Sequence, residues 1–121
     1  MIDRKQGLLI GIVGSCKSGK SVLKAGLEQH GYRAKHIAQE HSFAPSMWQK
    51  LTNPDVLIFL DVTFEESRRR YKLNWTIRDY DEQTHRLRHA REHADLIVDT
   101  TVAPPEEVLK RVIEFIQSLE K

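Results

Sequence analysis

Residues 14 to 21 combine glycines, hydroxyls and a lysine in an order that suits phosphate binding. Their sequence is Gly14, Ser15, Cys16, Lys17, Ser18, Gly19, Lys20 and Ser21, which fits the pattern G-x-x-x-x-G-K-S/T at every fixed position. The glycines let the backbone turn so that its N–H groups point into one concavity. We expect Lys20 to reach the β- and γ-phosphates of a nucleoside triphosphate and the Ser21 hydroxyl to bind Mg²⁺. The other loop residues contribute backbone contacts, so the pattern predicts a site for ATP or GTP with Mg²⁺.

The segments on either side of this loop have the patterns of a strand and a helix. An apolar run at about 8–13 precedes the loop, and a helix-compatible stretch at about 20–30 follows it and stops at Gly31. Such a helix turns the positive end of its dipole toward the phosphates. Further strands are expected at about 32–38, 55–61 and 96–99, and further helices at about 45–51, 63–73 and from 104 onward. Alternating strands and helices predict an α/β fold with a parallel sheet.

The composition is that of an ordinary soluble domain. The 121 residues suffice for a single domain, 1–121, with 40% hydrophobic and 30% charged residues. No apolar run approaches the ~20 residues of a membrane span, and the first residues lack a signal-peptide core. Cys16 is the only cysteine, which excludes an internal disulfide and favours the reducing cytoplasm. The net charge of +2 is too small to indicate nucleic acid as a partner.

Two further segments resemble the nucleoside and nucleotide kinases of the thymidylate kinase-like group. Residues 54–65, which read PDVLIFLDVTFE and are followed by Arg70, are similar to the segment P-D-x-x-x-x-L-D-V-x-x-E of that group. Residues 93–100 and 105–108 are similar to its last strand and helix. With the phosphate-binding loop, these segments cover about half of the chain. The resemblance implies a three-layer α/β/α P-loop fold in a trimmed form, with a small parallel sheet of about four strands.

The chain departs from these kinases in the region that binds their acceptor. They usually carry five core strands and an acceptor-binding insertion, which here is missing or reduced to Ser42–Leu51. We therefore expect a sheet in the order 2-1-3-4, with the second strand beside the loop strand. Ligands of open parallel sheets sit beyond the carboxyl ends of the strands. Gln39, Glu40 and His41 should consequently lie near the γ-phosphate.

Glu40 and Asp61 are the two carboxylates that could assist the metal. Glu40 could hold Mg²⁺ through a water molecule or accept a proton from the acceptor hydroxyl; the alternative is an ordinary solvated loop carboxylate. Asp61 ends the third strand, where capping of the following turn is the favoured role. We expect Glu40, rather than Asp61, to act on the metal.

Arginines crowd the segment that follows the third strand. In the kinases that the chain resembles, this stretch is a mobile lid whose arginines approach the transferring phosphoryl group. The lid-like segment here spans about 74–93 and is expected to be a loop followed by a helix. Arg70 and Arg78 are the first candidates for a catalytic role. The alternative is a solvated helix face with pairs such as Arg88–Glu92.

The same segment contains histidines that recur every four residues, at His85, His89 and His93. On one helix they would share a face, a spacing that can bind zinc. They have no cysteine or acidic partner at a diagnostic offset, so a structural or solvated stripe is favoured.

These features together predict a cytoplasmic P-loop protein that binds a nucleoside triphosphate. Its activity would be kinase-like phosphoryl transfer to an unknown small-molecule acceptor, or hydrolysis, through Lys20, Ser21, Glu40 and a lid arginine. The alternative is a nucleotide-binding switch without catalysis, which the reduced acceptor region favours. A polyanion binder that uses the arginine-rich segment is disfavoured by the small net charge. An exposed edge on so small a sheet is compatible with a homodimer.

Overall fold

Four parallel strands form the sheet that carries the loop. The computed structural model describes residues 7–71 and 74–120. The strands are β1 (Leu9–Gly14), β2 (Arg33–His36), β3 (Val56–Asp61) and β4 (Leu96–Asp99). Their order is β2-β1-β3-β4 and all neighbours run parallel, which confirms the order predicted from the sequence.

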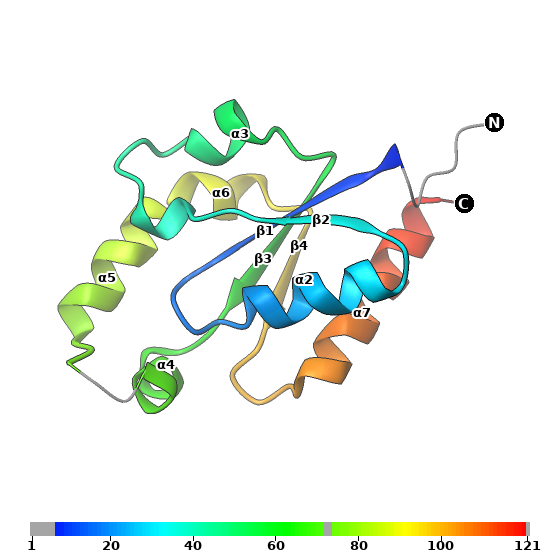
Figure 1. Ribbon diagram of the computed structural model, residues 1–121. Coiled ribbons are helices and arrows are strands. Elements are labelled where there is room, and N and C mark those ends of the chain that lie inside the picture. The colour runs from blue at the N-terminus through cyan, green and yellow to red at the C-terminus, as the bar shows by residue number, and fades with distance from the viewer. Residues whose placement is uncertain (1–6, 72–73, 121) are drawn as a thin grey trace.

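Helices cover both faces of this sheet (Figure 1). Within the described residues they are α2 (Lys20–Gln29), α3 (Met47–Leu51), α4 (Phe64–Tyr71), α5 (Ile77–Arg86), α6 (Arg88–His93) and α7 (Pro105–Leu119), with a 3₁₀ turn, η1 (Gln39–His41), after β2. Side chains of α2 and α7 pack on one face, and side chains of α3 and α6 pack on the other. The α/β class is thus confirmed, and the arrangement is compatible with three layers. None of the described helices is long and apolar enough to cross a membrane.

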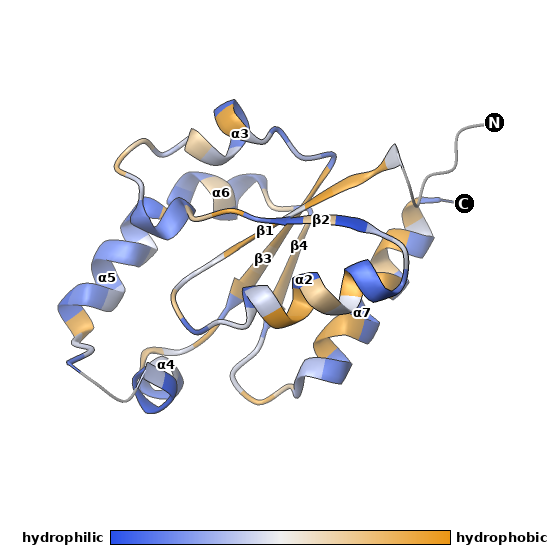
Figure 2. Ribbon diagram, viewed as in Figure 1, coloured by the Kyte–Doolittle hydropathy of each residue, from blue (hydrophilic) through white to orange (hydrophobic). Residues whose placement is uncertain are grey.

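The apolar strands carry two cores because their side chains alternate between the faces. The core under α2 and α7 includes Ile10, Ile12, Ile58, Leu60, Leu23, Leu27, Val112 and Ile116. The core on the opposite face includes Val13, Leu57, Phe59, Ile37, Trp48, Leu87 and Ala90. Figure 2 shows these apolar strands at the centre of the molecule, whereas β2 and α5 are largely polar. β2 lies at an edge of the sheet, and most of its residues are exposed, which suits its charged side chains.

The lid-like segment is more helical than the sequence predicts. Instead of a loop and one helix, it contains α5 and α6, which meet at Leu87. α5 begins early because Thr76 and Asp79 form a capping box, in which each side chain accepts from the other residue's backbone N–H. Because the two helices meet at Leu87, His85 lies on α5, whereas His89 and His93 lie on α6. The end predicted for the preceding helix, near position 73, lies outside the described residues.

Candidate functional site

The predicted phosphate-binding loop joins β1 to α2 at the carboxyl edge of the sheet. Gly14 lies so close to β3 that a Cβ there would be 2.6 Å from both the Leu60 carbonyl oxygen and Ser18 Oγ. Gly19 has φ 105° and Lys17 has φ 66°, so the backbone passes twice through the left-handed region. Such turns aim successive N–H groups at one point. The loop backbone is therefore suited to binding anions through its N–H groups.

The ammonium group of Lys20 is buried inside this loop, where its side chain is 5% exposed. Nζ donates to the carbonyl oxygens of Gly14 at 2.8 Å and Ser15 at 3.0 Å. It also donates to Glu40 Oε2 at 2.8 Å. A buried ammonium needs such compensation, because burying a charge without a partner is costly. Lys20 and Glu40, predicted separately from the sequence, are thus direct partners.

Glu40 reaches the loop because η1 follows β2, and β2 pairs with the loop strand. Its side chain is 4% exposed. Oε1 is buried and has no hydrogen-bond partner among the residues that the structure describes. The reading of Glu40 as a solvated loop carboxylate is therefore wrong.

The loop opens into a hollow of about 750 Å³. Its wall includes Cys16, Lys17, Lys20, Ser21, His36, Glu40 and His41. Ser21 Oγ lies 3.5 Å from His36 Nδ1. Burial, together with the nearby Lys20 ammonium, lowers the pKa of His36 from its usual 6.5. A neutral imidazole therefore adjoins the predicted magnesium ligand.

Gln83 of α5 contacts the middle of the loop, which the sequence analysis did not foresee. Its Oε1 accepts from the Cys16 backbone N–H at 2.9 Å, and its Nε2 donates to Cys16 Sγ at 3.1 Å. Gln83 is buried, as is Leu87 four residues later. That spacing marks the inner face of α5 and was the one signal in the sequence that could have indicated Gln83.

Arg70 connects the loop to the residue after β4 through hydrogen bonds. Its guanidinium donates to the Lys17 carbonyl oxygen at 3.0 Å and to the Thr100 carbonyl oxygen at 2.6 Å. Its Nε donates to Glu66 Oε2 at 2.8 Å. Hydrogen bonds from Arg69 and then Arg70 lower the pKa of Glu66 to about 2. Arg70, a predicted catalytic arginine, is therefore held at the loop by an ionised carboxylate.

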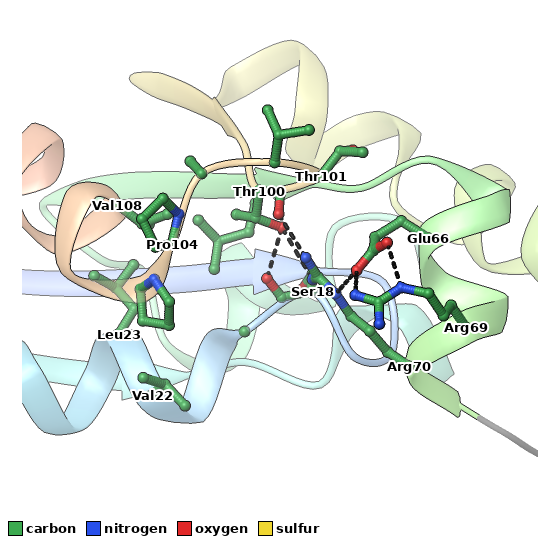
Figure 3. A pocket seen from close by; sticks show the side chains of 15 residues that line it. Ser18, Val22, Leu23, Glu66, Arg69, Arg70, Thr100, Thr101, Pro104 and Val108 are labelled. Atoms are coloured by element: carbon green, nitrogen blue, oxygen red, sulfur yellow. Dashed lines mark hydrogen bonds and ion pairs between the residues drawn. The ribbon is translucent and has the colours of Figure 1, made fainter.

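A second cavity, of about 360 Å³, begins beside the Arg70 side chain (Figure 3). Ser18 and Thr100 lie at its inner end, where Thr100 Oγ1 donates to the Ser18 carbonyl oxygen at 2.9 Å. Its apolar wall includes Val22, Leu23, Pro104 and Val108. The sequence analysis missed this cavity, because its two walls are far apart in the chain and meet only through the sheet.

Two other candidates, Arg78 and Asp61, form no hydrogen bond or ion pair with Lys20 among the described residues, although Asp61 lines a hollow together with Ser15 of the loop. The Arg78 side chain is 87% exposed and pairs with Glu82 at 3.7 Å. It lines a separate hollow that includes no residue of the loop. Asp61 accepts from the Val62 backbone N–H at 3.1 Å and from Arg91 Nη1 at 3.0 Å. Its contact with Val62 is the local turn interaction expected from its position at the end of β3.

No protein-family model matches this chain, and a search of curated proteins finds no significant match. The functional assignment therefore depends on the site itself.

Proposed function

We propose that the protein binds a nucleoside triphosphate, ATP or GTP, with Mg²⁺ at the loop from Gly14 to Ser21. The observation that carries the proposal is the buried Lys20 ammonium, held by two loop carbonyls and Glu40 at the end of a parallel strand. A cation kept inside a glycine-containing turn at a helix N-terminus is suited to phosphate. We infer that the α/β fold is a P-loop fold of the kinase-like type that the sequence resembles.

The loop backbone would hold the phosphates while Lys20 moves from Glu40 to their oxygens. Ser21 would bind the magnesium ion directly and Glu40 would bind it through water. The fit is supported by chemistry: both offer oxygen, which Mg²⁺ prefers, and Glu40 Oε1 is buried without a partner. When bound, the ion neutralises charge on the phosphates.

The cavity that has Ser18 and Thr100 at its inner end suits the base of the nucleotide. It begins where the loop meets α2, and its volume is about 360 Å³. Apolar walls with a few polar groups are typical of sites for planar rings. Val22 and Pro104 supply such a wall, and Thr100 and Arg70 supply the polar end.

The reaction we propose is transfer of the terminal phosphoryl group to a small acceptor, or to water. Glu40 would accept the proton of the attacking hydroxyl or place the metal-bound water. Arg70 is the first arginine for the phosphoryl group, since it already contacts the loop at Lys17. Arg78 would need α5 to move, because it pairs with Glu82 on the outer side of that helix.

A nucleotide-binding switch is the second candidate function. Ser42–Leu51 forms only a turn and the short α3, whose Trp48 is buried in the core, so this stretch supplies little acceptor surface. Nucleotide binding would also separate Lys20 from Glu40, and so change η1. Tight binding with no turnover, with water or with any acceptor, would identify the switch.

Calorimetric titration with ATP and GTP in the presence of Mg²⁺ tests the proposal. We expect Lys20→Met to weaken binding at least tenfold, because the variant lacks the positive charge that would pair with the phosphates. Lys24→Met is the matched control, since Lys24 lies one turn later on α2 and pairs with Glu28 at the surface. Ser21→Ala should remove the dependence on Mg²⁺ without disturbing the core, because Ser21 is exposed. Equal affinities in the wild type and Lys20→Met, with both folded, would refute it.

A further inference from the structure

Cys16, Glu40 and His41 form a cluster of three metal-ligating side chains at the mouth of the loop. Their ligand atoms all lie within 4.8 Å of one another, and no other such trio occurs among the residues that the structure describes. We propose that this cluster is a zinc site, which shares Glu40 with the proposed magnesium site at Ser21, so that the two metals bind to that carboxylate as alternatives. The inference does not depend on nucleotide binding.

The distance between the sulfur and nitrogen ligands suits tetrahedral zinc. Cys16 Sγ lies 3.6 Å from His41 Nε2. Zinc bonds of about 2.3 Å to sulfur and about 2.0 Å to nitrogen, at a tetrahedral angle, separate these atoms by about 3.5 Å. His41 Nε2 lies 3.8 Å from the Oε2 atom of Glu40, which brings the Glu40 carboxylate within reach of an ion bound by His41. The His41 side chain is 60% exposed, so its ring can turn toward an ion on the Glu40 carboxylate.

The buried carboxylate of Glu40 supplies an independent reason for a cation. Lys20 occupies Oε2, but Oε1 is buried and has no partner within residues 7–71 and 74–120. Unsatisfied buried carboxylate oxygens are costly, and metal coordination is one way in which proteins satisfy them. A metal ion on Glu40 leaves Lys20 in place, since the two oxygens of one carboxylate can serve two cations.

The surroundings of Cys16 also suit a metal-bound thiolate. Gln83 Nε2 donates to Sγ at 3.1 Å, while Gln83 Oε1 accepts from the backbone N–H of the same residue. Hydrogen bonds from neighbouring groups orient metal ligands and stabilise their charge. Three protein ligands of the types cysteine, histidine and glutamate leave a fourth position for water.

The histidine pair on α6 is the main competitor for zinc. The rings of His89 and His93 stack with centroids 4.2 Å apart. However, His89 Nδ1 accepts from Trp48 Nε1 at 3.0 Å, and His93 Nδ1 lies 2.8 Å from the His89 carbonyl oxygen. Neither ring is joined by a thiolate, so this pair is a weaker site.

Zinc titration of the purified, reduced full chain against a colorimetric chelator tests the proposal. We expect one Zn²⁺ per chain, and at least tenfold weaker binding in Cys16→Ser and in His41→Ala. His93→Ala is the control and should bind as the wild type does. With Co²⁺ in place of Zn²⁺, the wild type should show a near-ultraviolet thiolate charge-transfer band that Cys16→Ser lacks.

The opposite results are equally distinct. His41→Ala removes an exposed side chain, so its fold should persist, which circular dichroism verifies. Absence of stoichiometric zinc binding, or unchanged binding in folded His41→Ala and Cys16→Ser, would overturn the proposal. Loss of binding in His93→Ala alone would assign zinc to α6 and overturn it as well.

Discussion

The ammonium group of Lys20 lies 2.8 Å from the carboxylate of Glu40, and the two side chains are only 5% and 4% exposed. The lysine belongs to the loop and the glutamate to the turn after the neighbouring strand. The pair therefore links the proposed phosphate site to η1. Any anion that draws Lys20 away must leave Glu40 buried with another partner, and a metal ion can take that place.

The first prediction concerns the stability of this pair. Lys20→Met leaves the Glu40 charge buried without its cation, which should reduce the free energy of unfolding by about 3 kcal/mol. The double variant Lys20→Met/Glu40→Gln should recover much of the loss, because it removes both charges. Urea denaturation measures both effects. The control Lys24→Met removes only a surface pair and should stay within about 0.5 kcal/mol of the wild type. A loss in Lys20→Met no larger than in this control would contradict the prediction.

The second prediction separates catalysis from binding. Glu40→Gln keeps the size of the side chain and removes its charge, so kcat should fall at least tenfold (about 1.4 kcal/mol) with little change in nucleotide affinity. Asp61→Asn should instead cost stability, because Asp61 bonds to Val62 N–H and to Arg91. Steady-state assays alongside calorimetry distinguish the two. Loss of turnover in Asp61→Asn alone would mean that the third strand carries the acid that assists the metal.

The third prediction is a dependence of stability on acid pH through Glu66. Hydrogen bonds from Arg69 and Arg70 lower the pKa of Glu66 from 4.5 to about 2 in the folded protein. A carboxyl whose folded pKa is depressed stabilises the protein fully above about pH 4.5 and loses that contribution as the pH falls toward 2. The difference in unfolding free energy between wild type and Glu66→Gln should therefore shrink over this interval. Glu65→Gln, on the same helix turn, is the control, and an unchanged difference would contradict the prediction.

The fourth prediction concerns His36. Burial comes first and Lys20 second among the causes that lower its pKa below 6.5. In NMR titrations His36 should therefore titrate below the usual range, and Lys20→Met should raise its midpoint. Because the unfolded chain binds this proton more readily, His36 also reduces stability as the pH falls below 6.5. Lys50→Met, a surface change on α3, should leave the midpoint unchanged. A midpoint that is the same in Lys20→Met as in the wild type would refute the electrostatic contribution of Lys20.

The fifth prediction concerns α5. Among its residues only Gln83 is buried, and Tyr80 adds a 2.6 Å hydrogen bond to the Val62 carbonyl oxygen. Gln83→Leu removes both contacts to Cys16 and should speed amide exchange across 77–86. Glu82→Gln, at an exposed site on the same helix, should not. Nucleotide should raise the protection of 74–89 in the wild type. Full protection of α5 in Gln83→Leu would show that other contacts hold the helix.

Local patterns in the sequence determined the frame of this protein. The apolar runs of β1 and β3 are buried on both faces, and a buried parallel strand needs such runs, so their positions could be predicted closely. β4 was predicted with the bounds that the structure has, Leu96–Asp99. The loop motif is likewise local, because its glycines and lysine act within a single turn. The strand order then placed Glu40 near the loop before any contact was known.

Only the tertiary structure decided which side chains meet at this loop. Three sets of hydrogen bonds join residues 20 or more positions apart: Lys20 to Glu40, Gln83 to Cys16 and Arg70 to Thr100. Such contacts depend on the packing of helices against the sheet, which sequence periodicity does not specify. Arg70 and Arg78 were both candidates for a catalytic role from the sequence. In the structure, Arg70 on α4 contacts the loop, whereas Arg78 on α5 lies on an outer face with its charge in solvent.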